Sequence, residues 1–187
     1  TVISGKTDAV EQAVEALKGA KIAAKLLRVS HAFHSPVVAG VTEDVDKLIA
    51  ELDILGADKI VVSGITASPY NAAQGDDSVQ NIFSRHATAP IDFVGCLETA
   101  LEEGANIFLE VGAGKTLTSF AKGTLSNRAK VVQLHHSKHD GERMLMRALG
   151  QLFTLGCDIR WEGLYGKDSF VLVTLPETLL EKEPYWV

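Results

Sequence analysis

The sequence predicts an α/β fold, and three observations support that prediction. Segments with a strand pattern and segments with a helix pattern alternate along most of the 187 residues. The helical segments carry apolar residues at i, i+3, i+4 and i+7, whereas the strand segments are short runs rich in β-branched residues. Apolar side chains make up 46% of the chain, which is enough to build at least one hydrophobic core.

The first third of the chain is predicted to contain three strands separated by two helices. Thr7 can cap the first helix, which should end at Gly19. Ser35 is the expected N-cap of the second helix, with Pro36 in its first turn, where the missing N–H costs no hydrogen bond. The strands are expected at residues 2–5, 21–30 and 60–67.

Turn formers within residues 68–78 mark an internal boundary, where a change of topology is expected. Beyond it, Gly104 should stop one helix and Asp140 should cap another, and an extended tail should follow Gly156. The expected helices lie at residues 79–83, 93–104, from 115 onward and 142–155, and the expected strands at residues 106–111 and 130–134.

Charge and composition exclude several kinds of partner. Eighteen basic and 24 acidic side chains give a net charge of −6 without a basic cluster, so no nucleic acid is expected. The apolar runs are far shorter than the ~20 residues of a membrane helix, so no membrane is expected either. Cys96 and Cys157 form no C-x-x-C pair, which favours a reducing compartment, the cytoplasm. The start of the sequence shows no targeting segment, and we expect a piece of a longer protein.

His34 lies where a predicted strand meets a predicted helix, so its side chain is exposed on a turn that two rigid elements hold. An imidazole there can take a proton from a hydroxyl or a thiol, provided that another acceptor orients its second nitrogen. The residues alone favour the simpler interpretation, in which His31 and His34 are ordinary polar residues at the end of a strand. Residue chemistry therefore leaves a general base as one of two hypotheses.

Two further motifs are better explained without a ligand. Residues 111–116 imitate the end of a phosphate-binding loop, but Leu109 occupies the position of its first glycine, which favours a tight turn over nucleotide binding. His135 and His139 have the spacing of a helical metal pair, yet they follow a strand and lack the H-E-x-x-H arrangement. A loop is therefore expected there, and no metal.

The letters V-S-H-A-F-H-S-P of residues 29–36 resemble the acyltransferase domains of modular type I polyketide synthases, relatives of malonyl-CoA:acyl carrier protein transacylases. The resemblance covers essentially the whole chain, and continues through residues 2–5, 85–90 and 109–114 and the tail residues Trp161, Leu175, Pro176, Tyr185 and Trp186. It implies an incomplete ferredoxin-like small subdomain at 1–67, the C-terminal part of an α/β-hydrolase-like acyltransferase domain at 68–156, and a post-acyltransferase linker at 157–187.

The resemblance also implies roles for four residues. In this family a serine in a G-H-S-x-G elbow attacks the acyl-CoA thioester, and the last histidine of an H-A-F-H motif, here His34, serves as the base. The main-chain carbonyl of His86 would orient the ring of His34. Phe33 and His31 belong to the motif variant that accompanies malonyl units in this family. The physical reason is that the ring of Phe33 would leave little room for a methyl group on the acyl α-carbon.

No G-x-S-x-G motif occurs in the 187 residues, so the resemblance implies a fragment that is inactive alone. Malonyl-CoA would be the substrate, without a bound cofactor, and a carrier protein's phosphopantetheine thiol would accept the acyl group. The expected partners are the acyl carrier protein, the remaining half of the acyltransferase domain and the neighbouring ketosynthase. The alternative is a non-catalytic structural or docking piece of the megasynthase.

Overall fold

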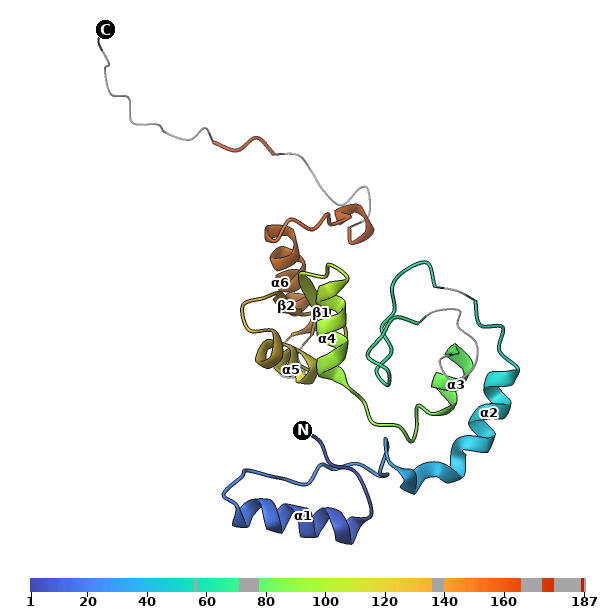
Figure 1. The fold of residues 1–187 in the computed structure, drawn as a ribbon. Helices are drawn as coiled ribbons and strands as arrows, with labels where there is room; N and C mark the ends of the chain where they lie inside the picture. The colour runs from blue at the N-terminus through green and yellow to red at the C-terminus, as the bar shows by residue number, and fades with distance from the viewer. Residues whose placement is uncertain (56, 71–77, 136–139, 166–172, 177–185, 187) are drawn as a thin grey trace.

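The computed structural model describes residues 1–55, 57–70, 78–135, 140–165, 173–176 and 186. Helices α4, α5 and α6 gather with two strands in one layered unit, and α1, α2 and α3 lie apart from it (Figure 1). In chain order the elements are α1 (Thr7–Gly19), the 3₁₀ helix η1 (Pro36–Val41), α2 (Thr42–Ala50), α3 (Val79–Ser84), α4 (Phe93–Glu102), β1 (Ile107–Glu110), α5 (Thr116–Leu125), β2 (Lys130–Gln133), α6 (Gly141–Thr154) and the 3₁₀ helix η3 (Trp161–Gly163).

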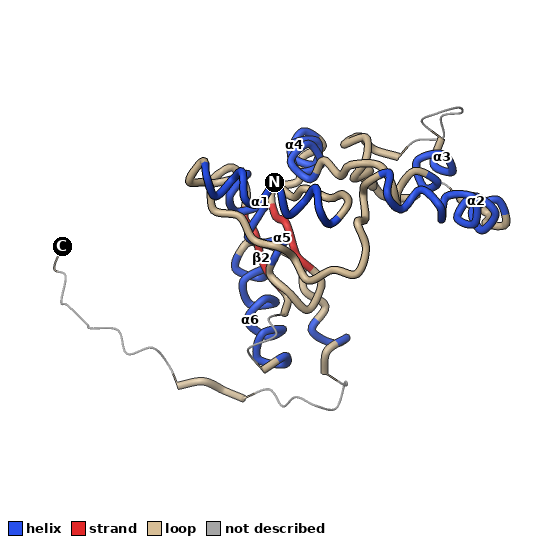
Figure 2. The backbone as a smooth tube through the Cα atoms, turned by 90° about the horizontal axis from the view of Figure 1, so that it is seen from below, coloured by secondary structure: helices blue, strands red, loops and turns tan. Residues whose placement is uncertain are grey.

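The two strands form a parallel pair, in register from Ile107 opposite Lys130 to Glu110 opposite Gln133. Parallel strands cannot be joined by a tight turn, and α5 supplies the crossover between them. Figure 2 shows both strands in red, side by side among the surrounding helices. The strands and helices predicted for residues 93–155 are therefore confirmed, within a residue or two at their ends.

The core lies on the two faces of this strand pair. Because successive strand residues point to opposite faces, Val131 packs with α4 and α5, whereas Val132 packs with α6. The first cluster consists of Leu97, Ala121, Leu125 and Ala129, with Phe93, Leu101, Phe108 and Val131 against it. The second consists of Val132, Ala148 and Leu152, with Ile107, Leu134, Cys157 and Ile159 against it.

Several helix ends follow the sequence signals. The carboxylate of Asp140 accepts a hydrogen bond of 2.8 Å from the Arg143 N–H, which makes Asp140 the N-cap of α6 as predicted. Gly104 follows the end of α4 with φ +94°, a left-handed conformation that favours glycine. Ser35 is the N-cap of η1, so the helix predicted after it is confirmed, but in two pieces, η1 and α2.

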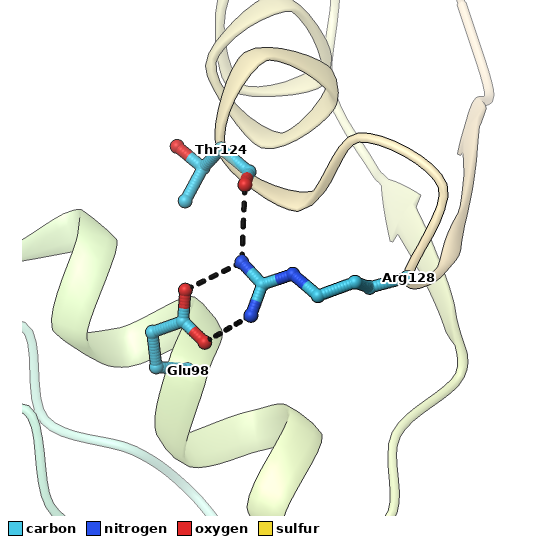
Figure 3. A network of polar contacts seen from close by, with 3 residues as sticks. All are labelled: Glu98, Thr124 and Arg128. Carbon is cyan, nitrogen blue, oxygen red and sulfur yellow. Dashed lines mark hydrogen bonds and ion pairs between the residues drawn. The ribbon is translucent and has the colours of Figure 1, made fainter.

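An ion pair joins α4 to the turn after α5. Arg128 donates from both terminal nitrogens to the two carboxylate oxygens of Glu98, each at 2.6 Å, and also donates to the Thr124 carbonyl at 3.1 Å (Figure 3). Hydrogen bonding by Arg128 lowers the pKa of Glu98, and the same contact raises the pKa of Arg128. Both side chains are exposed, so the pair orients the two helices more than it stabilises them.

The three strands predicted for the first third of the chain are wrong. Residues 2–5 and 21–30 form no strand, and within residues 60–67 a single antiparallel bridge joins Val62 to Pro69. A strand persists only when a neighbouring strand satisfies its N–H and C=O groups, and in the described residues none of these three segments lies beside such a strand. The sheet of a ferredoxin-like subdomain is therefore not formed in the described part of residues 1–67. Helix α1 confirms the first predicted helix, but the predicted cap is wrong: Thr7 is the first helical residue, and the N-cap is Lys6, whose side chain makes no capping hydrogen bond.

Other expectations concern segments that are described in part. Most of the boundary predicted at residues 68–78 and the tail residue Tyr185 lie outside the described residues. Cys96 and Cys157 are free thiols. In the described parts of the chain, no helix is both long enough and apolar enough to cross a lipid bilayer.

Candidate functional site

His34 lies in a strained turn that is tied to a segment far along the chain. Its φ of +59° is in the left-handed region, which a residue with a Cβ adopts at a cost. Its backbone N–H donates to the carbonyl of Ala87 at 2.7 Å. This contact fixes the H-A-F-H turn against the segment that follows α3.

The ring of His34 is oriented by two main-chain carbonyls. Its Nδ1 lies 3.1 Å from the carbonyl oxygen of His86 and 3.2 Å from that of Ala89. A carbonyl can only accept a hydrogen bond, so Nδ1 carries a proton, and in the neutral ring Nε2 is the nitrogen with the lone pair. The His86 ring stands edge-on to the His34 ring, with the ring centroids 5.8 Å apart. The arrangement leaves an exposed imidazole whose Nε2 can take up a proton.

The end of α3 explains why the carbonyl of His86 is available. The N–H of His86 donates back to Phe83, and that of Ala89 donates back to Arg85, so the chain keeps a helical turn beyond Ser84. In a continued helix the carbonyl of His86 would bond the N–H of residue 90, but Pro90 has none. The proline thus leaves a main-chain acceptor that the ring of His34 uses.

His31 and Phe33 form a second contact on the same turn. Their ring centroids are 5.8 Å apart, and His31 Nδ1 lies 2.9 Å from the hydroxyl oxygen of Ser30. The side chain of Phe33 is 54% exposed, and its carbonyl accepts a hydrogen bond of 2.7 Å from the Ser4 hydroxyl. The structure therefore places all four residues singled out by the resemblance around one turn, in two pairs: His34 with His86, and His31 with Phe33.

Sequence reasoning missed three groups at this site. Ser4, Ala87 and Ala89 contribute a hydroxyl and two carbonyls, yet none of them carries a chemical signal in the sequence. Pro90 was the available signal, because a proline after a helix leaves unpaired carbonyls one turn earlier. Where those carbonyls point depends on tertiary structure, which the sequence pattern does not contain.

The turn between β1 and α5 is occupied by the protein's own carboxylate. Glu110 accepts hydrogen bonds from the N–H groups of Leu117 at 3.2 Å and Thr118 at 2.8 Å. Burial works to raise the pKa of Glu110, but hydrogen bonds from Thr118 and Leu117 outweigh it and hold that pKa below its usual value. A carboxylate at this helix N-terminus fills the position that a phosphate would take in a phosphate-binding loop.

Of the two histidines considered as metal ligands, His135 and His139, the structure describes only His135. His135 is half-buried at the end of β2, and His139 lies outside the described residues. Among the residues that the structure describes, no three histidine, cysteine, aspartate or glutamate side chains form a group suited to a metal ion.

The sequence is similar to parts of much longer enzymes. No protein-family model matches it. Polyketide synthase GfsA of Streptomyces halstedii is 28% identical over 190 residues, which cover all of this chain and 2% of that protein. Non-reducing polyketide synthase terA of Aspergillus terreus is 25% identical over 193 residues, which cover all of this chain and 9% of that protein. The chain thus spans a small share of the curated relatives it matches.

Solved structures define the class of the fold. The acyltransferase domain from the second module of the salinomycin polyketide synthase matches with a TM-score of 0.80 and 26% identity, over 92% of this chain and 40% of that one. Malonyl CoA-acyl carrier protein transacylase from Clostridium perfringens matches with a TM-score of 0.71 and 25% identity, over 81% of this chain and 45% of that one. The fold is that of an acyltransferase domain. The relatives are polyketide synthases, and the chain is similar in sequence and fold to part of the acyltransferase domain of such an enzyme.

Proposed function

We propose that this chain is the C-terminal part of a malonyl-selective acyltransferase domain in which His34 is the general base. The observation that carries the proposal is the pair of carbonyls, from His86 and Ala89, that face Nδ1 of His34. They hold the tautomer in which Nε2 is the free base, and they do so without adding a full charge to the site. The nucleophilic serine belongs to a part of the domain outside these 187 residues.

In the first half-reaction the serine hydroxyl attacks the thioester carbonyl of malonyl-CoA while its proton passes to Nε2 of His34. The tetrahedral intermediate then collapses, the C–S bond breaks, and the CoA sulfur leaves with the proton held by His34. In the second half-reaction the phosphopantetheine thiol of an acyl carrier protein gives its proton to Nε2 and attacks the acyl-serine ester. The serine oxygen leaves and recovers that proton, so the exchange of esters needs no oxidant and no bound cofactor.

Phe33 is proposed to select the acyl group by shape. Its half-exposed ring lies one residue before His34, next to the ring of His31. A ring against the α-carbon of the acyl group would leave little room for the methyl group of methylmalonyl. Malonyl is therefore the proposed extender unit, and His31 and Phe33 are the proposed specificity residues.

The proposed domain organisation follows the resemblance: a small subdomain at 1–67, the C-terminal part of the large subdomain at 68–156, and a linker at 157–187. The malonyl CoA-acyl carrier protein transacylase that the fold resembles supports an acyl carrier protein as the partner. Exposed apolar side chains such as Leu26, Leu27 and Val29 support a further part of the domain covering the first third. We propose a cytoplasmic enzyme beside a ketosynthase, with this chain inactive alone.

Intact-protein mass spectrometry tests the reaction class. The complete acyltransferase domain that contains this chain is incubated with malonyl-CoA, and separately with methylmalonyl-CoA. We expect a mass increase of one malonyl group with malonyl-CoA and a weaker signal with methylmalonyl-CoA. The added mass should be lost when a carrier protein with a free phosphopantetheine thiol is added. A complete, folded domain that acquires no acyl group from either thioester would contradict the proposal and favour a structural or docking role.

A further inference from the structure

The peptide unit that precedes His34 is hydrogen-bonded at both of its ends. The carbonyl of Phe33 accepts from the Ser4 hydroxyl at 2.7 Å, and the N–H of His34 donates to the Ala87 carbonyl at 2.7 Å. A peptide unit is planar, so fixing its oxygen and its hydrogen fixes the whole plane. The direction in which the chain enters His34 is therefore set by residues from two distant segments.

A second hydroxyl closes the same turn from the other side. The hydroxyl of Ser35 donates to the carbonyl of Ala32 at 2.6 Å and accepts from the N–H of Val37 at 3.3 Å. The side chain is 4% exposed, so both of its hydrogen bonds are protected from water. Ser35 thus joins the peptide two units before His34 to the first turn of η1.

These contacts hold His34 in a conformation that it would not adopt freely. At φ +59° its Cβ crowds the backbone, and a relaxed turn would return to negative φ. That rotation would swing the imidazole away from the carbonyls of His86 and Ala89, which lie 3.1 and 3.2 Å from Nδ1. The ring orientation therefore depends on the turn.

We propose that Ser4 and Ser35 are positioning residues for His34, because their hydroxyls hold the carbonyls of Phe33 and Ala32 in the turn that keeps Nδ1 protonated against the carbonyls of His86 and Ala89. The importance of this positioning for catalysis rests on the proposed function, since the orientation of the His34 ring matters to the reaction only if His34 is the base. The orientation itself is a property of the folded chain, and it can be measured without any turnover.

Imidazole ¹⁵N NMR of the full 187-residue chain, labelled at histidine, measures the tautomer of His34. Loss of one pair of ring signals in His34→Gln assigns them. We expect Nδ1 of His34 to resonate as a protonated nitrogen and Nε2 as an unprotonated one, at a pH where the ring is neutral. In Ser35→Ala the two shifts should move toward each other as the tautomers mix, and in Ser4→Ala, at an exposed position, they should do so by a smaller amount.

Two variants serve as controls. Ser35→Thr keeps the hydroxyl and should restore the wild-type shifts, which a general loss of packing would not do. Ser30→Ala removes the hydroxyl next to His31 and should leave the His34 signals in place. If Ser35→Ala shows no cooperative thermal unfolding, the proposal is tested by the His34 ring shifts of Ser4→Ala alone. Wild-type His34 shifts in Ser4→Ala and in any Ser35→Ala that unfolds cooperatively would overturn the proposal.

A kinetic readout in the complete domain separates this inference from the proposed function. Ser35→Ala should lower kcat for malonyl transfer by about 10-fold or more with little change in KM, because a misplaced base affects the proton transfer and not substrate binding. If His34→Ala leaves the rate unchanged, the proposed function fails while the tautomer result stands. If His34→Ala is inactive but both serine variants keep wild-type kcat and wild-type shifts, the inference alone fails.

Discussion

Residues 1–55 and residues 93–165 are held in place by different forces. In the later region most of the buried apolar side chains gather on the two faces of one parallel strand pair. Within residues 1–55, all of which are described, Ile49 is the one apolar side chain that is buried. His34 lies in this earlier region, and hydrogen bonds to residues 86–89 fix it. The later region is a framework built by apolar burial, whereas the site is positioned by polar contacts to residues 86–89, which precede that region.

Removing a buried leucine should separate the two regions most clearly. Leu125, the last residue of α5, is 0% exposed in the cluster that α5 forms with α4 and the strands. Leu125→Ala should therefore lower the free energy of unfolding by about 2–5 kcal/mol. Leu26, in the earlier region, is 54% exposed, and Leu26→Ala should change it by no more than about 0.5 kcal/mol. Urea unfolding followed by circular dichroism measures both. Similar losses for the two variants would mean that the comparison is wrong.

The turn at residues 63–68 packs against α4, where the hydroxyl of Thr99 donates to the carbonyl of Ala67 at 2.6 Å, and this contact can be tested with one methyl group. A Cβ at Gly95 would lie 2.5 Å from an Asp92 carboxylate oxygen and 2.7 Å from the Cβ of Ala67, so Gly95→Ala should destabilise by about 1–3 kcal/mol.

Gly123 in α5 is the matched control, because a Cβ there meets nothing within 4 Å and alanine favours helix. Gly123→Ala should stabilise by about 0.5–1 kcal/mol. Thermal unfolding of the pair gives opposite signs if the turn packs as described, and equal signs if it does not.

A substitution at the site should change substrate preference without changing stability, unlike a substitution in the core of the later region. Phe33→Ser combined with His31→Tyr should raise the ratio of methylmalonyl to malonyl kcat/KM in the complete domain by about 10-fold, the low end for one methyl group. Stability should change little because Phe33 is half exposed. Loss of malonyl transfer without any relative gain for methylmalonyl would show that the motif positions His34 and does not select the substrate.

The smallest effect concerns the cap of α5. The folded pKa of Glu110 lies below the unfolded value of about 4.3, so its contribution to stability is complete above that value and is lost as the pH falls through the folded pKa. Glu110→Gln should therefore lower the Tm slightly at pH 7, and the difference should shrink as the pH falls below the unfolded value and through the folded pKa of Glu110. Glu103→Gln, at an exposed position after α4, controls for the loss of charge. A difference in Tm that is constant with pH would contradict this account.

Local signals explain which parts of the fold could be predicted. The helix from Gly141 to Thr154 and its cap at Asp140 depend on residues within one or two turns, and the sequence contains them. The strands expected at residues 2–5 and 21–30 depend on partners elsewhere, so a strand pattern alone was not sufficient. The same holds for the site: the resemblance identified His34 and His86, but the Ser4 contact joins residues 29 positions apart, and no local pattern encodes it.

The rate of malonyl transfer by His34→Ala in the complete domain tests the central claim most directly. His31→Ala, on the same turn, is the matched control, since His31 Nδ1 faces the hydroxyl of Ser30 and not a main-chain carbonyl. We predict that His34→Ala lowers kcat/KM by about 10²-fold or more, as expected for loss of a general base, while His31→Ala stays within a few-fold of the unsubstituted domain. A His34→Ala domain that is folded and as active as the unsubstituted one would contradict the account.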